Sequence, residues 1–203
     1  MSDYTEKRYE FSFEVAAPAA FFGRPDCGAA PVSYPVPPRS ALIGMASCLA
    51  FSRDAYFWPE RIEVCRRPKY NKFCMNYNGP LRKSRGPFQI MMTILEDVDY
   101  KVYGSIRGYD RPDGGRNPMH QLQDVFEHRL KNGIFYRMPC MGINEFTPSY
   151  FGPLREDTQA DVSVNETIPS LLDLMFDRGT YGRLAPVFIQ NARIREGVLQ
   201  YVE

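Results

Sequence analysis

The side chains best suited to acid–base chemistry are two histidines, His120 and His128, the only histidines among the 203 residues. Histidine titrates near neutral pH and can move a proton during catalysis, although it more often serves at surfaces or in packing. The five cysteines form no Cys-x-x-Cys pair, so a zinc site is not expected. The glycine motifs of serine hydrolases and of P-loop and dinucleotide-binding enzymes do not occur in a suitable context. We therefore expect no cofactor.

Positive charge gathers in one stretch of a chain whose net charge is only +1. The stretch from Arg61 to Arg85 contains eight basic residues and one acid, and aromatic residues are interleaved with them. Because Arg and Lys neutralise phosphates while aromatic rings stack on unpaired bases, the stretch favours RNA contact over a merely solvated hairpin. The expected contacts are Arg67, Lys69, Lys72, Arg82, Lys83 and Arg85, with Tyr70, Phe73 or Tyr77 stacking. The acidic segment 154–177 is suited either to a basic protein surface or to solvent.

These residues must be positioned by a mixed set of elements. Alternating polar and apolar residues predict strands at 8–15 and 61–66, and a proline-rich entrance leads into a buried helix over 41–51 capped by Ser40. Strands at 88–95 and 99–107 complete an extended basic hairpin, 66–107. An amphipathic helix over 119–131 with its Leu122, Val125, Phe126 and Leu130 on one face ends at Gly133, and a strand follows at 134–138.

The order strand, helix, strand, strand, helix, strand is typical of the α+β ferredoxin-like or RNA-recognition-motif-like (βαββαβ) fold. We predict such a domain over 1–153, with the hairpin as a protruding thumb. Residues 154–203 are expected to form a short extension packed on the same domain, containing a short helix at 168–176 and two short strands within 184–201. The polar N-terminal region and the lack of a long apolar span predict a soluble, cytoplasmic protein that does not enter a membrane.

The residue types at the start of the buried helix predict a phosphate-binding pocket. Arg24, Tyr34, Arg39 and Ser40 border a helix N-terminus, where free N–H groups attract anions. Gly44, one turn later, lets another backbone approach closely. The alternative is that Arg39 only lies on a turn and binds nothing.

Two stretches resemble the CRISPR-associated Cas-five family. Residues 34–44 (YPVPPRSALIG) are similar to its N-terminal signature, and Phe22–Gly23–Arg24–Pro25 is similar to the loop after its first strand. Residues 126–133, 139–142 and 145–146 resemble the later helix-to-strand segment, most closely in the subtype I-C branch. The resemblance covers residues 9–51 and 119–152 in the expected order, and Asn144 stands where the family has an arginine.

Membership would imply a RAMP domain with a thumb, and a subunit that binds the five-prime handle of CRISPR RNA (crRNA). Its partners would be a Cas-seven-type backbone subunit, a large Cas-eight-type subunit and, within the assembled Cascade complex, target DNA. The residues expected to bind RNA on this basis are Arg24, Tyr34, Arg39, Ser40, Gly44 and Asn144, together with the cations of the basic hairpin.

In the I-C branch the subunit also cleaves precursor crRNA, using a tyrosine at the end of the opening helix and a lysine–histidine pair before the second helix. Here Ala50 stands at the tyrosine position, and Met119–His120 aligns with the pair only with a two-residue shift. We therefore expect a non-catalytic binding subunit. The alternative is a metal-independent endoribonuclease that uses His120 or His128, and a third possibility is a small stand-alone RNA-binding domain.

Overall fold

The computed structural model describes residues 8–28, 30–77, 88–109, 117–176 and 183–201. Strands dominate these ranges, and two helices accompany them. In chain order the elements are β1 (Tyr9–Ala20), α1 (Arg39–Ser47), β2 (Ala55–Val64), β3 (Lys69–Tyr77), β4 (Phe88–Gly108), α2 (Pro118–Asn132), β5 (Tyr150–Gly152), β6 (Glu166–Phe176), β7 (Leu184–Arg195) and β8 (Val198–Gln200). Neither helix in the described ranges is long and apolar enough to cross a membrane.

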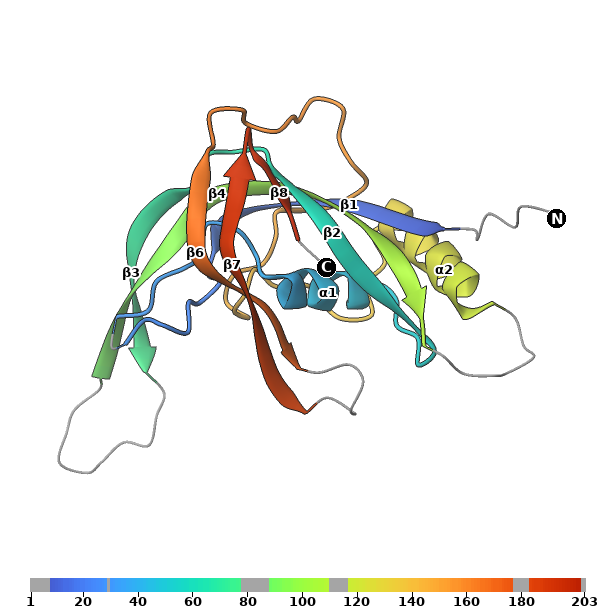
Figure 1. Cartoon of the computed structure of the whole chain (residues 1–203), viewed down its shortest axis with the longest axis horizontal. Coiled ribbons are helices and arrows are strands. Elements are labelled where there is room, and N and C mark those ends of the chain that lie inside the picture. The colour runs from blue at the N-terminus through green and yellow to red at the C-terminus, as the bar shows by residue number, and fades with distance from the viewer. Residues whose placement is uncertain (1–7, 29, 78–87, 110–116, 177–182, 202–203) are drawn as a thin grey trace.

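The strands of the described ranges join in one sheet of antiparallel ladders, in the order β5-β1-β4-β2-β8-β7-β6. β4 is the longest strand, so β1 lies along one of its sides while β2 and β3 share the other. The sheet curls around α1, and α2 lies beside β1 (Figure 1). The expected mixture of an antiparallel sheet with few helices is confirmed. The C-terminal strands reach the same sheet through the β8–β2 pairing.

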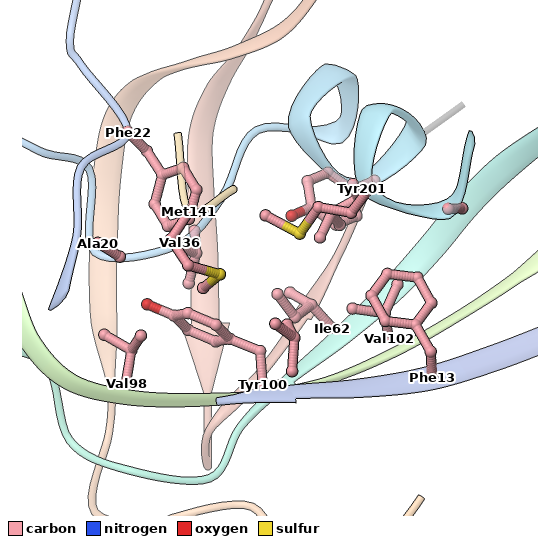
Figure 2. Close-up of a cluster of buried hydrophobic side chains, with 14 of the residues drawn as sticks. Phe13, Ala20, Phe22, Val36, Ile62, Val98, Tyr100, Val102, Met141 and Tyr201 are labelled. Atoms are coloured by element: carbon pink, nitrogen blue, oxygen red, sulfur yellow. The ribbon is translucent and has the colours of Figure 1, made fainter. Parts of the chain in front are cut away.

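The core lies between the sheet and α1. Along β1 the side chains of Phe11, Phe13 and Val15 are buried at alternate positions, as the period of a strand requires. Figure 2 shows Tyr100 and Val102 of β4 reaching into this space from the sheet. The Tyr100 hydroxyl donates a hydrogen bond to the Pro35 carbonyl (2.9 Å), so its one polar atom is satisfied. Each fully buried large apolar side chain contributes about 1.5–3 kcal/mol.

The opposite face of the sheet carries a buried ionic cluster. Glu14 and Asp99 are both fully buried, and the Arg155 guanidinium donates to a carboxylate oxygen of each, at 2.9 and 2.7 Å. The Thr158 hydroxyl also donates to Glu14, while the Lys101 ammonium donates to the carbonyls of Arg155 and Thr158. These bonds attach residues 155–158 to the sheet. The main chain at the start of the acidic segment is therefore held against the sheet, while the side chains of Glu156 and Asp157 stay exposed.

The predicted pair of strands at 88–95 and 99–107 is wrong, because these residues form the single strand β4. Asp97, in the expected turn, takes a positive φ of 52°, and the register with β1 runs from Ala17↔Val98 to Ala19↔Glu96. The position between them on β1 is Pro18, which has no N–H to donate. The register is the same on both sides of Asp97, so the strand continues through this position without a bulge. The hairpin partner of its first half is β3.

Two further predictions near the C-terminus had different outcomes. The helix expected at 168–176 is wrong: these residues belong to β6, which pairs with β7. The partner strand lies later in the chain, so local propensity could not reveal it. The two strands expected within 184–201 are confirmed as β7 and β8, although β7, with 12 residues, is not short.

The elements around the helices need three corrections. α1 begins at Arg39 after Pro38, and no side chain caps it, so Ser40 is not its cap. α2 and its left-handed Gly133 (φ 64°) match the prediction, but Val125 is 36% exposed and lies off the buried face. Residues 134–138 form no strand.

Candidate RNA interface and active site

Arg39 and Tyr34, expected beside a surface phosphate pocket, lie inside the protein with exposed fractions of 1% each. Arg39 Nε is 2.9 Å from Asp173 Oδ1, and its guanidinium lies 4.1 Å from the centroid of the Trp58 ring. Burial raises the pKa of Asp173, and the charge of Arg39 opposes that rise. The Tyr34 hydroxyl donates to the Ser170 carbonyl and accepts from the Leu172 amide.

These contacts give the signature a structural role. They join the start of α1 to β6, more than a hundred residues away in the chain. As the chain is folded here, neither Arg39 nor Tyr34 can reach an RNA. Arg24 stays partly exposed, paired with Asp26. Ser40 and Gly44 are half-buried, and a Cβ added at Gly44 would meet nothing within 4 Å.

The cations of the basic hairpin are partly within the described structure. Lys69 and Lys72 of β3 are exposed, as is Arg67 just before it, and the Tyr70 side chain is 47% exposed. Phe73 instead packs against Phe146, with ring centroids 5.5 Å apart. Arg82, Lys83 and Arg85 lie outside the described residues, as does the Tyr77 side chain. The RNA contacts of this hairpin stay predictions.

Asn144 is exposed in a loop beside the end of β1. The backbone of this loop approaches the backbone of Phe21, whose amide donates to the Met141 carbonyl (2.9 Å). Gly142, in the same loop, has a φ of 94°. A Cβ at Gly142 would lie 1.8 Å from the Phe21 carbonyl oxygen, so only glycine fits. This approach joins the loop that contains Asn144 to the chain just after β1, at Phe21 and Phe22.

The best-defined polar constellation is at the N-terminus of α2. The Asn117 side chain caps the helix by accepting hydrogen bonds from the amides of Met119 and His120, and its Nδ2 donates to the Tyr9 hydroxyl at 3.0 Å. The His120 side chain is 54% exposed, and its Nε2 lies 3.4 Å from Asp124 Oδ2. Its ring centroid is 6.0 Å from that of Tyr9.

This arrangement suits proton transfer next to a phosphate. The exposed imidazole can act as a base, the carboxylate of Asp124 orients it, and the positive end of the helix dipole favours an anion nearby. His128, by contrast, lies exposed in the later part of α2, with Asn132 as its neighbour. Ala50 is 1% exposed, and Met119 packs near Gly108.

A trough of about 920 Å³ is lined by residues of α2, β1, β2 and β4. Its basic side chains are Arg8, Arg61 and Lys131, and α2 also contributes Gln123 and Glu127. His120, Asp124, Glu127 and Lys131 follow one stripe of α2, because they are spaced by three or four residues. The trough thus lies on the same flank of α2 as His120, although His120 is not among the residues that line it.

The cysteines and carboxylates offer no competing centre. All five cysteines are free thiols, and burial raises the pKa of Cys65 to about 12. In the described part of the chain, no group of three or more His, Cys, Asp or Glu side chains is arranged to hold a metal ion.

Comparison with known proteins identifies the family. The model of the family described as CRISPR-associated protein (Cas_Cas5) matches residues 11–149. The chain belongs to the Cas5 family. It is also 31% identical over 204 residues to the CRISPR pre-crRNA endoribonuclease Cas5d of Thermus thermophilus, an alignment that covers 89% of this chain and 86% of the relative. The resemblance inferred from residues 34–44 and 126–146 is confirmed.

Solved structures support the same fold. A structure described as that of a CRISPR-associated protein has a TM-score of 0.73 and 19% identity, and covers 97% of this chain and 94% of its own. A chain of a CRISPR RNA-guided surveillance complex has a TM-score of 0.51 and 16% identity, with coverages of 89% and 91%. The similarity in fold to the first of these structures thus covers nearly the whole chain, beyond the residues that the family model matches.

One prediction is corrected by these comparisons. The sequence led us to expect a subunit without catalytic activity, because the tyrosine and lysine positions hold Ala50 and Met119. The 31% identical Cas5 relative is named as an endoribonuclease, which overturns that expectation.

Sequence reasoning also missed several site residues. Asn117–Pro118 is an N-cap signal followed by proline at the first helical position, and it could have placed the start of α2. Asp124, four residues after His120, could have been found by helical spacing. Trp58, Asp173 and Tyr9 gave no comparable signal, because their partners are distant in sequence.

Proposed function

We propose that this Cas5-family protein binds crRNA and cleaves its precursor. The observation that carries the proposal is the 31% identity, over 89% of the chain, to a protein named as a pre-crRNA endoribonuclease. The α2 N-terminus supports it, because His120 is exposed there beside an orienting carboxylate. Of the two histidines, His120 is the one that comes into line with the family's catalytic histidine when a two-residue shift is applied.

The proposed step is attack by a ribose 2′-hydroxyl on the adjacent phosphorus. His120 takes the hydroxyl proton, the new O–P bond forms, and the bond to the 5′-oxygen breaks. The leaving oxygen takes up a proton, so the products carry a 2′,3′-cyclic phosphate and a 5′-hydroxyl. The positive end of the α2 dipole stabilises the charge that develops on the phosphate.

The finer architecture belongs to the same proposal. The neighbouring strands β5, β1, β4 and β2 correspond to the fourth, first, third and second strands of a βαββαβ unit. This order of strands in the sheet supports a ferredoxin-like domain. The β3–β4 hairpin would be its RNA-binding thumb. We place the protein in the cytoplasm with crRNA, a Cas-seven-type backbone subunit, a large Cas-eight-type subunit and target DNA as partners, and its similarity in fold to a surveillance-complex chain agrees with this placement.

Incubation with precursor repeat RNA in EDTA tests the catalytic proposal. We expect one specific cut, and His120→Ala should slow it at least about 100-fold because a general base is lost. His128→Ala is the matched control on the same helix and should cleave at the wild-type rate. An uncut repeat, or a fully active His120→Ala variant, would refute the assignment.

A further inference from the structure

Exposed apolar and basic side chains gather where the end of α1 meets the segment after α2. The exposed fractions are 77% for Phe51, 46% for Ile134, 84% for Tyr136 and 62% for Met138. Arg53 and Arg137 are exposed beside them in sequence. We name these six residues the aromatic–arginine surface. Large side chains exposed together on a folded protein usually mark a binding surface.

Backbone contacts hold the two parts of this surface together. The amides of Tyr136 and Arg137 both donate to the Cys48 carbonyl, at 2.8 and 3.3 Å. Arg129 Nη1 donates to the Leu49 carbonyl at 2.6 Å, so a cation meets the negative end of α1. The main chain at 136–137 is thus anchored while its side chains stay free for a ligand.

The charge of the surface has one sign. Residues 48–53 and 129–138 contain no acid, and of their four basic residues Arg53, Arg129 and Arg137 belong to this flank, while Lys131 lines the trough. The acids that border these segments are Asp54, which is half-buried, and Glu127, which lines the trough. In the described part of the chain neither Arg53 nor Arg137 pairs with a carboxylate. A ligand that fits this surface is therefore anionic and offers flat apolar faces.

We propose that the aromatic–arginine surface binds an unpaired stretch of RNA, with bases stacked on Phe51 and Tyr136 and phosphates on Arg53 and Arg137. Aromatic side chains interleaved with cations are the recurring means of holding single strands. This inference rests on the proposed function, which supplies RNA as the ligand, and adds a second contact site to it.

The new site is distinct from the trough. His120 and Arg129 are nine residues apart on α2, which places them on opposite flanks of the helix at 3.6 residues per turn. An RNA at His120 lies on the trough side, while the aromatic–arginine surface lies on the flank that faces the end of α1. A single strand that touches both must pass around α2.

The test measures affinity for a short fluorescein-labelled oligouridylate and for the same strand in a duplex. We expect Tyr136→Ala to weaken single-strand binding about tenfold, and Tyr136→Phe to preserve it because stacking needs only the ring. Arg137→Ala should lower the salt slope of the affinity by about one. Phe176→Ala, at an aromatic residue that is 55% exposed on β6, is the matched control and should bind normally.

The outcomes separate this site from the catalytic one. Tyr136→Ala should raise the concentration of precursor RNA needed for half-maximal cleavage, whereas His120→Ala should lose cleavage and keep its oligouridylate affinity, so either proposal can fail alone. Wild-type single-strand affinity in both Tyr136→Ala and Phe51→Ala would overturn the inference. So would unchanged RNA affinity with lost co-purification of other Cascade subunits, which would make the surface a protein interface. Thermal melting of each variant shows whether it is folded.

Discussion

At the scale of single residues, the buried carboxylate of Glu14 stabilises the fold. Glu14 is fully buried on β1, where burial alone would raise the pKa of its carboxyl group. Hydrogen bonds from the amide and guanidinium of Arg155 and from Thr158 outweigh that effect and hold the pKa below its ordinary value. The ionised form of Glu14 is therefore the one that stabilises the fold.

This predicts a pH dependence of stability. The contribution of Glu14 is fully present above the carboxyl pKa of the unfolded chain and is lost as the pH falls through the lower folded pKa. Glu14→Gln should lower the free energy of unfolding at pH 7 by about 3 kcal/mol, because Arg155 loses one of its two buried carboxylate partners. It should also flatten the decline toward acid pH in urea titrations. Glu10→Gln, on the same strand but exposed, is the control, and equal behaviour of the two variants would contradict the prediction.

At the scale of elements, α2 is the piece that presents the proposed base. Asn117 begins it, Gly133 ends it, and the buried residues Leu122, Phe126 and Leu130 fix which flank His120 occupies. Phe126 meets Phe11 of β1 edge-to-face, with centroids 5.7 Å apart. The position of the base is thus set by a cap and by one apolar stripe.

Removing the cap should affect both stability and activity. Asn117→Ala takes away the acceptor for the amides of Met119 and His120 and the donor to Tyr9, at a cost of about 1 kcal/mol in unfolding free energy. Precursor cleavage should fall as well, because the first turn that carries His120 loosens. Asn132→Ala, at the other end of α2, should leave cleavage unchanged. Thermal melts and single-turnover assays measure the two effects, and full activity of Asn117→Ala would argue against a positioned His120.

For the whole molecule, the Arg39–Asp173 pair joins the start of the chain to its end. Arg39 opens α1, Asp173 belongs to β6, and Trp58 and Tyr201 enclose the guanidinium. Tyr201 also donates a hydrogen bond to the Pro37 carbonyl at 2.5 Å. The signature of the family is therefore held in place by residues outside the matched region.

Substitution of this pair tests its structural role. Arg39→Met leaves Asp173 buried without its cation and should cost about 3 kcal/mol or more in urea unfolding. The double variant Arg39→Met/Asp173→Leu should recover most of that loss, since no buried charge remains. Arg53→Met removes an exposed arginine and should change little. If Arg39→Met were as stable as Arg53→Met, the pair would not be the link inferred here.

The local signals in the sequence determined much of this protein. The period of two in β1, the apolar stripe and the terminal glycine of α2, and residues 34–44 predicted the mixed fold and the family. Each depends on residues that are neighbours in the chain, so propensity and spacing suffice to detect it.

The tertiary structure decided what lies between distant residues. β6 is a strand because it pairs with β7. β4 continues through Asp97 because β1 pairs with β4 residues on both sides of it. Arg39 points inward because its partner Asp173 lies inside the protein. It also brought residues 134–138 onto the end of α1 and left Tyr136 exposed. Such contacts form between residues that are far apart in the chain and that only folding brings together. Local sequence patterns therefore do not predict them.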